Sequence, residues 1–247
     1  MIFNCLIAGV GGQGTVLASK LIAEAAMRRG FEVRTTETIG MAQRGGSVVS
    51  HIRIAPGVPD GAEGATGATR HTSAPDQPSA CATGQTAVCI AANAGAPGMP
   101  GEYAIFSPLI PTGAAHALIA FEPSEAARCL PYLAADGALI VCDSAVKPFT
   151  PGGAGAAPEQ PYDAAAVVGY IKAQYPEAAV IDGRPLKEYS AKTLNTALLG
   201  AAAQAGIFPF AAGDLLDVIS EIRRFREQNI KSFEMGRDLY NEYIRRH

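Results

Sequence analysis

The hydrophobic pattern of the first forty residues predicts a strand, a helix and a second strand. A short apolar run over residues 2–8 ends at a glycine, which is typical of a buried strand. Leu17, Leu21 and Ala25 then recur at a spacing of four, as on one face of a helix. Residues 32–36 form the second predicted strand. Such a β-α-β opening favours a parallel sheet.

The pattern farther along the chain continues this alternation. Apolar and more polar positions alternate over residues 48–54, which predicts a strand with one more polar face. Further strands are predicted at 117–121, 138–142 and 179–182, and helices at 122–130, 163–174, 191–205, 213–224 and 230–244. We expect a turn at Asp136-Gly137. The predicted fold class is α/β: one Rossmann-like, doubly wound domain over residues 1–247, with a mostly parallel sheet and helices on both faces.

Residues 55–102 differ in kind from their surroundings. They are rich in Gly, Ala, Pro, Ser and Thr and nearly lack large apolar side chains. We interpret them as a long, flexible surface insertion and not as a second domain. An apolar patch at 87–92 predicts a short strand that would make the insertion a hairpin. Residues 150–161 are predicted to be a Pro/Gly/Ala linker.

Composition and charge exclude several classes of function. The net charge of −3 and the absence of a basic run argue against nucleic-acid binding. No apolar stretch is long enough to span a membrane, and the N-terminus lacks a signal peptide's basic start, so we expect a cytoplasmic protein. Only 17% of residues are charged, which fits a large buried interface. The five cysteines lack the close pairs of a cluster or zinc site, which favours isolated thiols.

The sequence GVGGQG at residues 9–14 satisfies the G-x-G-x-x-G pattern between a strand and a helix. Glycines there allow a tight turn and let a diphosphate approach the backbone, and the start of the helix supplies free N–H groups. A tight turn with no ligand is the alternative. A nicotinamide enzyme also needs an acid after the second strand; Glu37 lies at a suitable distance, but Thr35 and Thr36 occupy the strand tip, so NAD stays open.

Several longer strings carry a resemblance to a known family. They are TTETIGMAQRGGSVVSHIRI, SPLIPTGAAHALIAFEPSEAARCLPYL, NTALLGAAAQAG and NIKSFEMGRDLY, together with the glycine motif. The set resembles the gamma-type domain of the 2-oxoacid:ferredoxin oxidoreductases, in particular the small subunit of the indolepyruvate enzymes. The resemblance covers nearly the whole chain except residues 55–102. That insertion departs from the family pattern, in which the SPLIP segment follows closely on the preceding strand.

The resemblance implies a role within a larger enzyme. In such enzymes an aryl pyruvate and coenzyme A are converted to an acyl-coenzyme A, CO₂ and reduced ferredoxin. A large partner subunit carries the thiamine diphosphate and the iron–sulfur clusters, while the gamma-type domain contributes to the handling of coenzyme A. The sequence of this chain is consistent with such a role, because it has neither cluster-spaced cysteines nor a recognisable thiamine diphosphate motif. We therefore expect the isolated chain to be inactive.

The candidate site combines the glycine turn with two other segments, and it contains no predicted catalytic or metal-binding residue. The candidate ligand contacts are Gly11, Gly12, Gln13, Gly14, Thr15, Gln43, Arg44, Gly45, Ser47 and Asn195. Gln13 is expected either to donate to a phosphate or to close the loop. Arg44 is expected to pair with a phosphate or a partner's carboxylate, or to be a surface arginine in a turn. Asn195 is expected to cap a helix or to contact the ligand.

The remaining polar candidates have simpler interpretations. His51 is expected to be a packed or hydrogen-bonded histidine, and Glu122 an acid that favours a helix N-terminus. Ser107 and Pro108 are expected to form a rigid turn facing the crevice or the partner. No acid/base pair can be assigned, which disfavours a stand-alone NAD(P)-dependent dehydrogenase. A nucleotide-sensing module remains chemically compatible, but it leaves the family strings unexplained.

Overall fold

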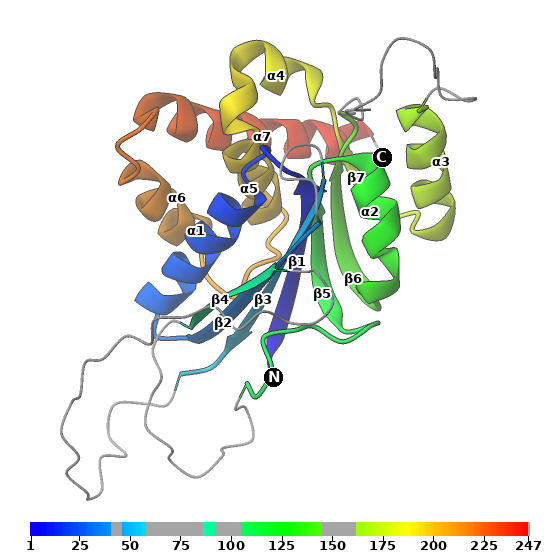
Figure 1. The fold of residues 1–247 in the computed structure, drawn as a ribbon. Coiled ribbons are helices and arrows are strands. Elements are labelled where there is room, and N and C mark those ends of the chain that lie inside the picture. The colour runs from blue at the N-terminus through cyan, green and yellow to red at the C-terminus, as the bar shows by residue number, and fades with distance from the viewer. Residues whose placement is uncertain (41–45, 58–85, 92–104, 145–161, 247) are drawn as a thin grey trace, which may run out of the picture.

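The computed structural model describes residues 1–40, 46–57, 86–91, 105–144 and 162–246, and the backbone alone over 86–91 (Figure 1). The strands are β1 (Phe3–Val10), β2 (Glu32–Ile39), β3 (Ser47–Ala55), β4 (Thr86–Ala91), β5 (Ala115–Ala120), β6 (Leu133–Cys142) and β7 (Ala179–Ile181). The helices are α1 (Thr15–Arg28), α2 (Pro123–Cys129), α3 (Ala164–Gln174), α4 (Arg184–Ser190), α5 (Leu194–Gln204), α6 (Ala212–Ser220) and α7 (Arg226–Arg246), with 3-10 helices η1 (Leu130–Tyr132) and η2 (Ala191–Thr193).

The strands form one sheet in the order β4-β2-β3-β1-β5-β6-β7. From β1 to β7 the neighbouring strands are parallel. On the other side of β1, the pairs β1–β3, β3–β2 and β2–β4 are antiparallel. The predicted α/β fold class is confirmed, but the prediction of a mostly parallel sheet is wrong, because parallel pairing occupies only one half of this mixed sheet. Because β3 lies between β1 and β2, the opening β-α-β unit does not form an adjacent parallel pair.

Helices cover both faces of the sheet, as predicted. α1, α5, α6 and α7 pack on one face, and α2 and α3 pack on the other (Figure 1). In β1, Cys5 and Ile7 point to the first face, while Leu6 and Ala8 point to the second. Burial on both faces explains why this strand is a continuous apolar run without alternation.

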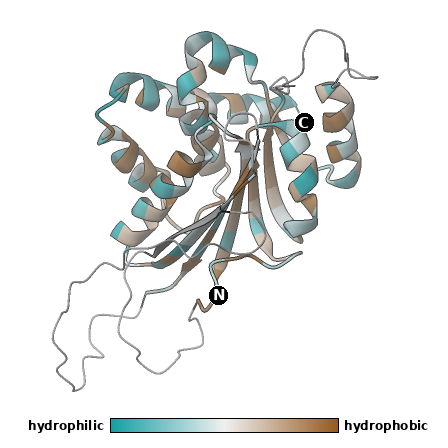
Figure 2. Cartoon of the chain, viewed as in Figure 1, coloured by the Kyte–Doolittle hydropathy of each residue, from teal (hydrophilic) through white to brown (hydrophobic). Residues whose placement is uncertain are grey.

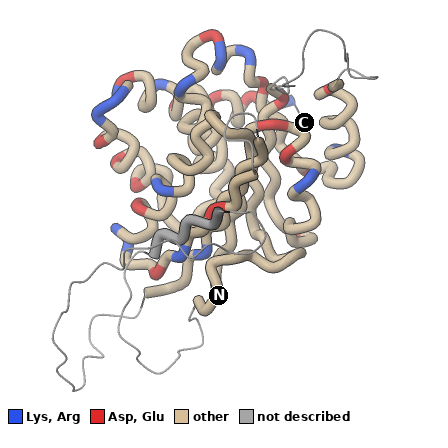
Figure 3. Tube along the Cα trace, viewed as in Figure 1, with Lys and Arg blue, Asp and Glu red and all other residues tan. Residues whose placement is uncertain are grey.

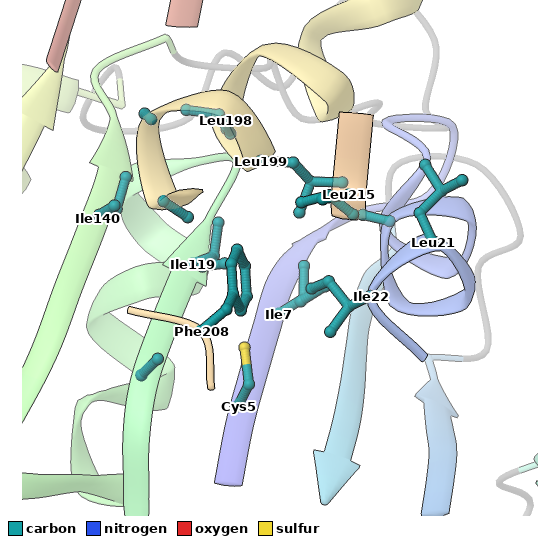
Figure 4. Packing of buried hydrophobic residues seen from close by; sticks show 14 of the residues in the cluster. Cys5, Ile7, Leu21, Ile22, Ile119, Ile140, Leu198, Leu199, Phe208 and Leu215 are labelled. Atoms are coloured by element: carbon teal, nitrogen blue, oxygen red, sulfur yellow. The ribbon is translucent and has the colours of Figure 1, made fainter. Parts of the chain in front are cut away.

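The larger core lies under α1, α5 and α6. Ile7 of β1, Ile22 of α1, Ile119 of β5 and Leu199 of α5 belong to this core, together with Phe208 (Figure 4). Hydropathy follows the same layers, since apolar residues line the strands and polar residues lie on the outer helices (Figure 2). The sheet therefore forms a stable base whose strand ends can position a site.

Helices α5 and α7 approach each other unusually closely. A Cβ atom added at Gly200 would lie 2.0 Å from the carbonyl oxygen of Phe233, and one at Gly236 would lie 1.8 Å from that of Ala197. Each contact is shorter than real Cβ contacts allow, so both positions require glycine. This packing fixes α5, whose first turn contributes Asn195 to the candidate site.

The structure corrects several sequence predictions. The expected turn at Asp136 lies within β6, where Leu133 pairs with Ala115 and Ala138 with Ala117, so the extra residues form a bulge. Helix α4 was not predicted. The predicted strand near residues 87–92 exists as β4, which pairs antiparallel with β2 at the edge of the sheet.

Two further sequence predictions lie largely outside the described residues. The linker at 150–161 and most of the insertion, residues 58–85 and 92–102, belong to this group. Among the helices that the structure describes, none combines the length and the apolar character needed to cross a membrane.

Candidate functional site

The glycine turn lies at the point where the helices that follow the parallel strands switch from one face of the sheet to the other. β1 and β5 are adjacent and parallel. The chain leaves β1 for α1 on one face, and it leaves β5 for α2 on the other. In open α/β sheets, ligands bind in the crevice outside the carboxyl ends of two such strands. Topology therefore places the candidate site at the glycine turn.

Some backbone N–H groups of the turn donate to other backbone atoms, and others have no acceptor among the described residues. The amide of Gly11 donates to the carbonyl oxygen of Gly46 at 2.8 Å, and that of Gln13 donates to Val10 at 3.1 Å. Within the described part of the chain, the amides of Gly12 and Gly14 have no acceptor. Both glycines have positive φ angles, 100° and 81°. With the first turn of α1, these amides present the donor set that a diphosphate requires.

Gln13 closes the turn. Its Oε1 atom accepts from the amide of Val10 at 2.8 Å, and its Nε2 atom donates to the carbonyl oxygen of Phe121 at 3.2 Å. The side chain thus joins β1 to the end of β5. Of the two interpretations of Gln13, the geometry favours loop closure over phosphate contact.

Thr15 begins α1 and is buried, and its methyl group packs beside Gly9. A Cβ atom at Gly9 would lie 2.8 Å from both Thr15 Cγ2 and Gln13 Oε1. The first glycine of the motif therefore serves close packing, whereas the space around Gly12 is open. Fewer residues of the turn are therefore free to face a ligand than the motif suggests.

Asn195 comes from the first turn of α5 and meets the glycine turn. Its side chain is 2% exposed, and its Nδ2 atom lies 3.5 Å from the carbonyl oxygen of Gly14. Thr193, not Asn195, is the N-cap of α5, so the expected capping role is wrong. The buried Oδ1 atom of Asn195 has no hydrogen-bond partner among the described residues. A buried acceptor without a donor is costly, so this atom is a local source of strain beside the turn.

The loop after β2 returns to the same turn. Gly40 donates to the carbonyl oxygen of Ser47 at 2.8 Å, and Gly46 accepts from Gly11, so both ends of this loop lie at the turn. Gln43, Arg44 and Gly45 fall outside the described residues. The hydroxyl of Ser47 donates to Glu125 Oε2 at 2.5 Å, so it is engaged within the protein.

Two buried carboxylates at the start of α2 face this edge of the sheet. Glu122 is 1% exposed and Glu125 is 3% exposed. Glu122 accepts from the amides of Ser124 and Glu125 at 2.8 and 3.1 Å, and from the hydroxyls of Ser124 and Tyr162. Desolvation by burial and, to a smaller extent, the neighbouring Glu122 carboxylate raise the pKa of the Tyr162 hydroxyl well above its usual value. From the sequence we interpreted Glu122 alone, as an acid at a helix N-terminus, and missed Glu125; the spacing of three between the two acids is the signal that could have indicated a cluster.

These carboxylates bear on the choice of ligand. Glu122 is neutralised locally by four hydrogen-bond donors and by the N-terminus of α2. Arg128 lies 3.4 Å from Glu125. The amides without an acceptor therefore lie on the α1 side of the crevice, at Gly12 and Gly14, whereas the carboxylates on the α2 side are compensated within the protein.

The structure disfavours the nicotinamide interpretation. In a dinucleotide-binding fold the second strand lies beside the first and its acid reaches the ribose. Here β3 separates β1 from β2. Glu37 is 4% exposed and accepts from Ser19 of α1 at 3.2 Å, so it lies beneath the helix and away from the crevice.

The other candidates lie away from the turn. His51 is buried on the α2 face, where Nδ1 accepts from the amide of Ile110 at 3.2 Å and desolvation lowers its pKa to about 4. It is a packed histidine, as expected. Ser107 is held by Arg53 at 2.7 Å, and Arg53 also bonds Asn4 at the amino end of β1. Ser107 therefore lies at the end of the sheet opposite the crevice, so of the two expectations only that of facing the partner stays a prediction.

In the described part of the chain, no group of metal ligands lies at the turn, and neither does the cleft at β6. Among the described residues, no three His, Cys, Asp or Glu side chains lie together as a metal site requires. Burial raises the pKa of Cys5, Cys129 and Cys142 to about 12, which keeps these thiols protonated. A cleft of about 580 Å³ lies between β6, the end of α3 and Tyr240, away from the glycine turn.

The comparisons with known proteins agree with this architecture. Residues 4–95 and 101–239 match the family model described as pyruvate ferredoxin/flavodoxin oxidoreductase. An indolepyruvate oxidoreductase subunit IorB from Archaeoglobus fulgidus is 27% identical in an alignment of 249 positions that covers 99% of this chain and 96% of the relative. The subunit of the same name from Methanothermobacter thermautotrophicus is 27% identical over 243 residues, 96% of each chain.

Solved structures share the fold. The gamma subunit of a keto/oxoacid ferredoxin oxidoreductase from Geobacter sulfurreducens superposes with a TM-score of 0.54 at 17% identity, covering 98% of both chains. A 2-oxoglutarate:ferredoxin oxidoreductase from Magnetococcus marinus, with 2-oxoglutarate, coenzyme A and succinyl-CoA bound, gives a TM-score of 0.54 at 16% identity. This chain matches over 98% of its own length but spans only 31% of that larger chain.

Proposed function

Because the chain belongs to the pyruvate ferredoxin/flavodoxin oxidoreductase family, we propose that it is the small subunit of an indolepyruvate or aryl pyruvate:ferredoxin oxidoreductase. The family membership confirms the resemblance carried by the sequence strings. The assembled enzyme would convert a 2-oxoacid and coenzyme A to acyl-coenzyme A, CO₂ and reduced ferredoxin. The observation that carries the proposal is the match, over nearly the full length of both chains, to relatives named as subunits of such an enzyme.

The proposal assigns the redox chemistry to a large partner subunit. Thiamine diphosphate there supplies the carbanion chemistry, and iron–sulfur clusters carry the electrons out. The described residues of this chain offer no cluster of metal ligands, and the three described cysteines are buried apart from one another. The heteromer and the cytoplasmic location expected from the sequence are parts of this proposal.

The proposal assigns this chain a contact to coenzyme A at the glycine turn. The amides of Gly12 and Gly14 supply donors for the diphosphate, and Asn195, which lies beside Gly14, is a further candidate contact. The loop containing Gln43, Arg44 and Gly45, which is anchored on the turn through Gly46, would add cationic and backbone contacts. Coenzyme A is also bound in the Magnetococcus marinus structure.

A stand-alone dehydrogenase is not favoured, because β3 separates the two strands that would hold NAD and Glu37 is buried under α1. Co-purification tests the proposed role directly. A tag on this chain, anaerobically co-expressed with a candidate large subunit from the same organism, should recover that subunit. Iron and thiamine diphosphate should follow the large subunit at a constant ratio through size-exclusion chromatography. Recovery of the tagged chain alone would contradict the proposal.

A further inference from the structure

Exposed basic side chains gather where η2 meets the start of α7. The set, which we call the basic corner, consists of Lys192, Arg223, Arg224, Arg226 and Lys231 together with the aromatic rings of Tyr189 and Phe225. All five basic residues are exposed. Figure 3 shows Lys and Arg along α4 and the connection from α6 to α7. The corner is cationic although the whole chain carries a net charge of −3.

The basic residues of this corner differ from several other surface arginines in their ion pairing. Elsewhere, arginines bridge carboxylates: Arg28 pairs with Glu221 at 2.6 Å, and Arg237 with Glu234 at 3.0 Å. By contrast, none of the five basic residues of the corner forms a salt bridge with any residue in the described ranges. Their charges are therefore available to an external anionic group.

Aromatic rings hold several of these cations in place. The Lys192 Nζ atom lies 5.2 Å from the centre of the Phe225 ring, and the Arg224 Cζ atom lies 5.1 Å from it. Lys231 Nζ lies 4.7 Å from the Tyr189 ring. Cation–π contacts of this kind restrict long side chains before binding, which lowers the entropy that docking would otherwise lose. They also connect η2 and α4 to the start of α7.

The backbone under Phe225 adopts a costly conformation that keeps the ring at the surface. Its φ of 57° is the only positive value for a non-glycine residue in the described part of the chain. Buried Asn229 holds the segment, since its amide donates to the Phe225 carbonyl oxygen at 2.8 Å and its Nδ2 atom donates to that of Arg224 at 3.1 Å. The ring remains 37% exposed. For a bulky residue this conformation is an outlier of the kind that clusters at functional positions.

We propose that the basic corner docks an acidic surface of the large partner subunit, an inference that rests on the proposed function. Arginine and aromatic side chains are enriched at protein interfaces, and unpaired surface cations steer an acidic partner into place. The corner offers both in one surface of fixed geometry. It adds an electrostatic contact to the assembly, at residues distinct from the glycine turn.

A pair of charge-matched variants tests this inference. The first replaces Arg223, Arg224 and Arg226 with Gln. The control replaces Lys20, Arg29 and Arg245 with Gln, which removes the same formal charge from exposed positions elsewhere. The dissociation constant for the purified large subunit is measured at low and at high ionic strength. At low salt the first variant should bind about tenfold more weakly than wild type and the control within about threefold of it. High salt should close the gap, because screening shortens the reach of surface charges.

A second variant tests the aromatic part without removing charge. Phe225→Gly relieves the positive φ, so the protein should unfold no more easily than wild type while its affinity for the large subunit falls severalfold. Equal weakening in both triple variants would overturn the inference and leave the proposed function intact. Loss of coenzyme A binding in the first triple variant, with subunit affinity unchanged, would also overturn it and assign the corner to a small polyanion. Failure of wild type to bind the large subunit would overturn the inference and the proposed function together.

Discussion

The side-chain amide of Asn195 lies 3.5 Å from the carbonyl oxygen of Gly14, so the first turn of α5 rests on the start of α1. Residues 181 positions apart in sequence thus meet at the edge of the glycine turn. The contact leaves no room for a side chain at Gly14, because a Cβ atom there would lie 2.9 Å from Asn195 Nδ2. The third glycine of the motif is therefore needed both for its φ of 81° and for this contact.

Substitution of Gly14 should separate these two effects. Gly14→Ala should lower the free energy of unfolding by about 2–3 kcal/mol, since strain and the clash with Asn195 add. Gly12→Ala has a similar positive φ but open space around it, so it should cost only about 1 kcal/mol. Adding Asn195→Ala to Gly14→Ala should recover part of the loss. Urea denaturation measures all three, and equal losses for Gly12→Ala and Gly14→Ala would refute this explanation.

The close packing of α5 on α7 gives a larger expected effect. Gly236→Ala places a methyl group against the Ala197 carbonyl oxygen, so the helices must separate, and we expect a loss of at least about 3 kcal/mol. Gly169→Ala, within α3 and with no atom near the added methyl group, is the matched control. It should raise stability by about 0.5–1 kcal/mol because alanine favours the helix. Thermal unfolding of both variants decides, and a neutral Gly236→Ala would show that the helices are not in this contact.

The buried imidazole of His51 should make stability depend on pH. Burial lowers its pKa to about 4 in the folded state, while in the unfolded chain it is near 6.5. The unfolded state therefore binds more protons between these values, so the contribution is complete above pH 6.5 and is lost as pH falls towards 4. The loss should reach up to about 3 kcal/mol.

A variant isolates this contribution from that of other groups. His51→Gln removes the titrating ring, so the stability difference from wild type should change between pH 6.5 and about 4 and stay constant above that window. Denaturant midpoints at a series of pH values measure the difference. A constant difference across the whole range would mean that His51 does not resist protonation in the folded state.

Much of the architecture was accessible from the sequence because local patterns determine it. The apolar run of β1, the glycine turn and the periodic face of α1 are each continuous in sequence and were predicted close to their observed bounds. The order of strands was not accessible, since the insertion of β3 between β1 and β2 depends on pairing between segments, not on the pattern within one. Helix α4 has seven residues with Pro185 at its start, too short for a periodic signal.

Only the part of the candidate site that depends on local sequence was predicted. Gly12 and Gly14 lie where the motif indicated, but the sequence could not show that Gln13 and Ser47 are used by neighbours from β5 and α2. The meeting of Asn195 with Gly14 is a long-range contact, and only the family strings pointed to that asparagine. Glu122 and Glu125 were missed as a cluster because each alone is explained by a helix N-terminus.

The ligand preference of the assembled enzyme provides a further prediction. Calorimetric titration of the complex should show binding of coenzyme A and much weaker binding of NAD. Gly12→Asp, which adds a negative charge in open space at the turn, should weaken coenzyme A binding at least about tenfold by repelling the diphosphate. Gly113→Asp, at another glycine with a positive φ and open surroundings, should leave it unchanged. Tight NAD binding without coenzyme A binding would reverse the assignment.

The central claim is that this chain acts only within a heteromeric oxidoreductase. The most direct measurement is the anaerobic reduction of a viologen acceptor by indolepyruvate and coenzyme A, with the isolated chain and with the chain co-expressed with its large subunit. We expect no activity and no stoichiometric iron in the isolated chain, and sustained reduction by the co-expressed complex. Sustained reduction by the isolated chain, free of the partner, would contradict the account, as would a co-expressed complex that remains inactive.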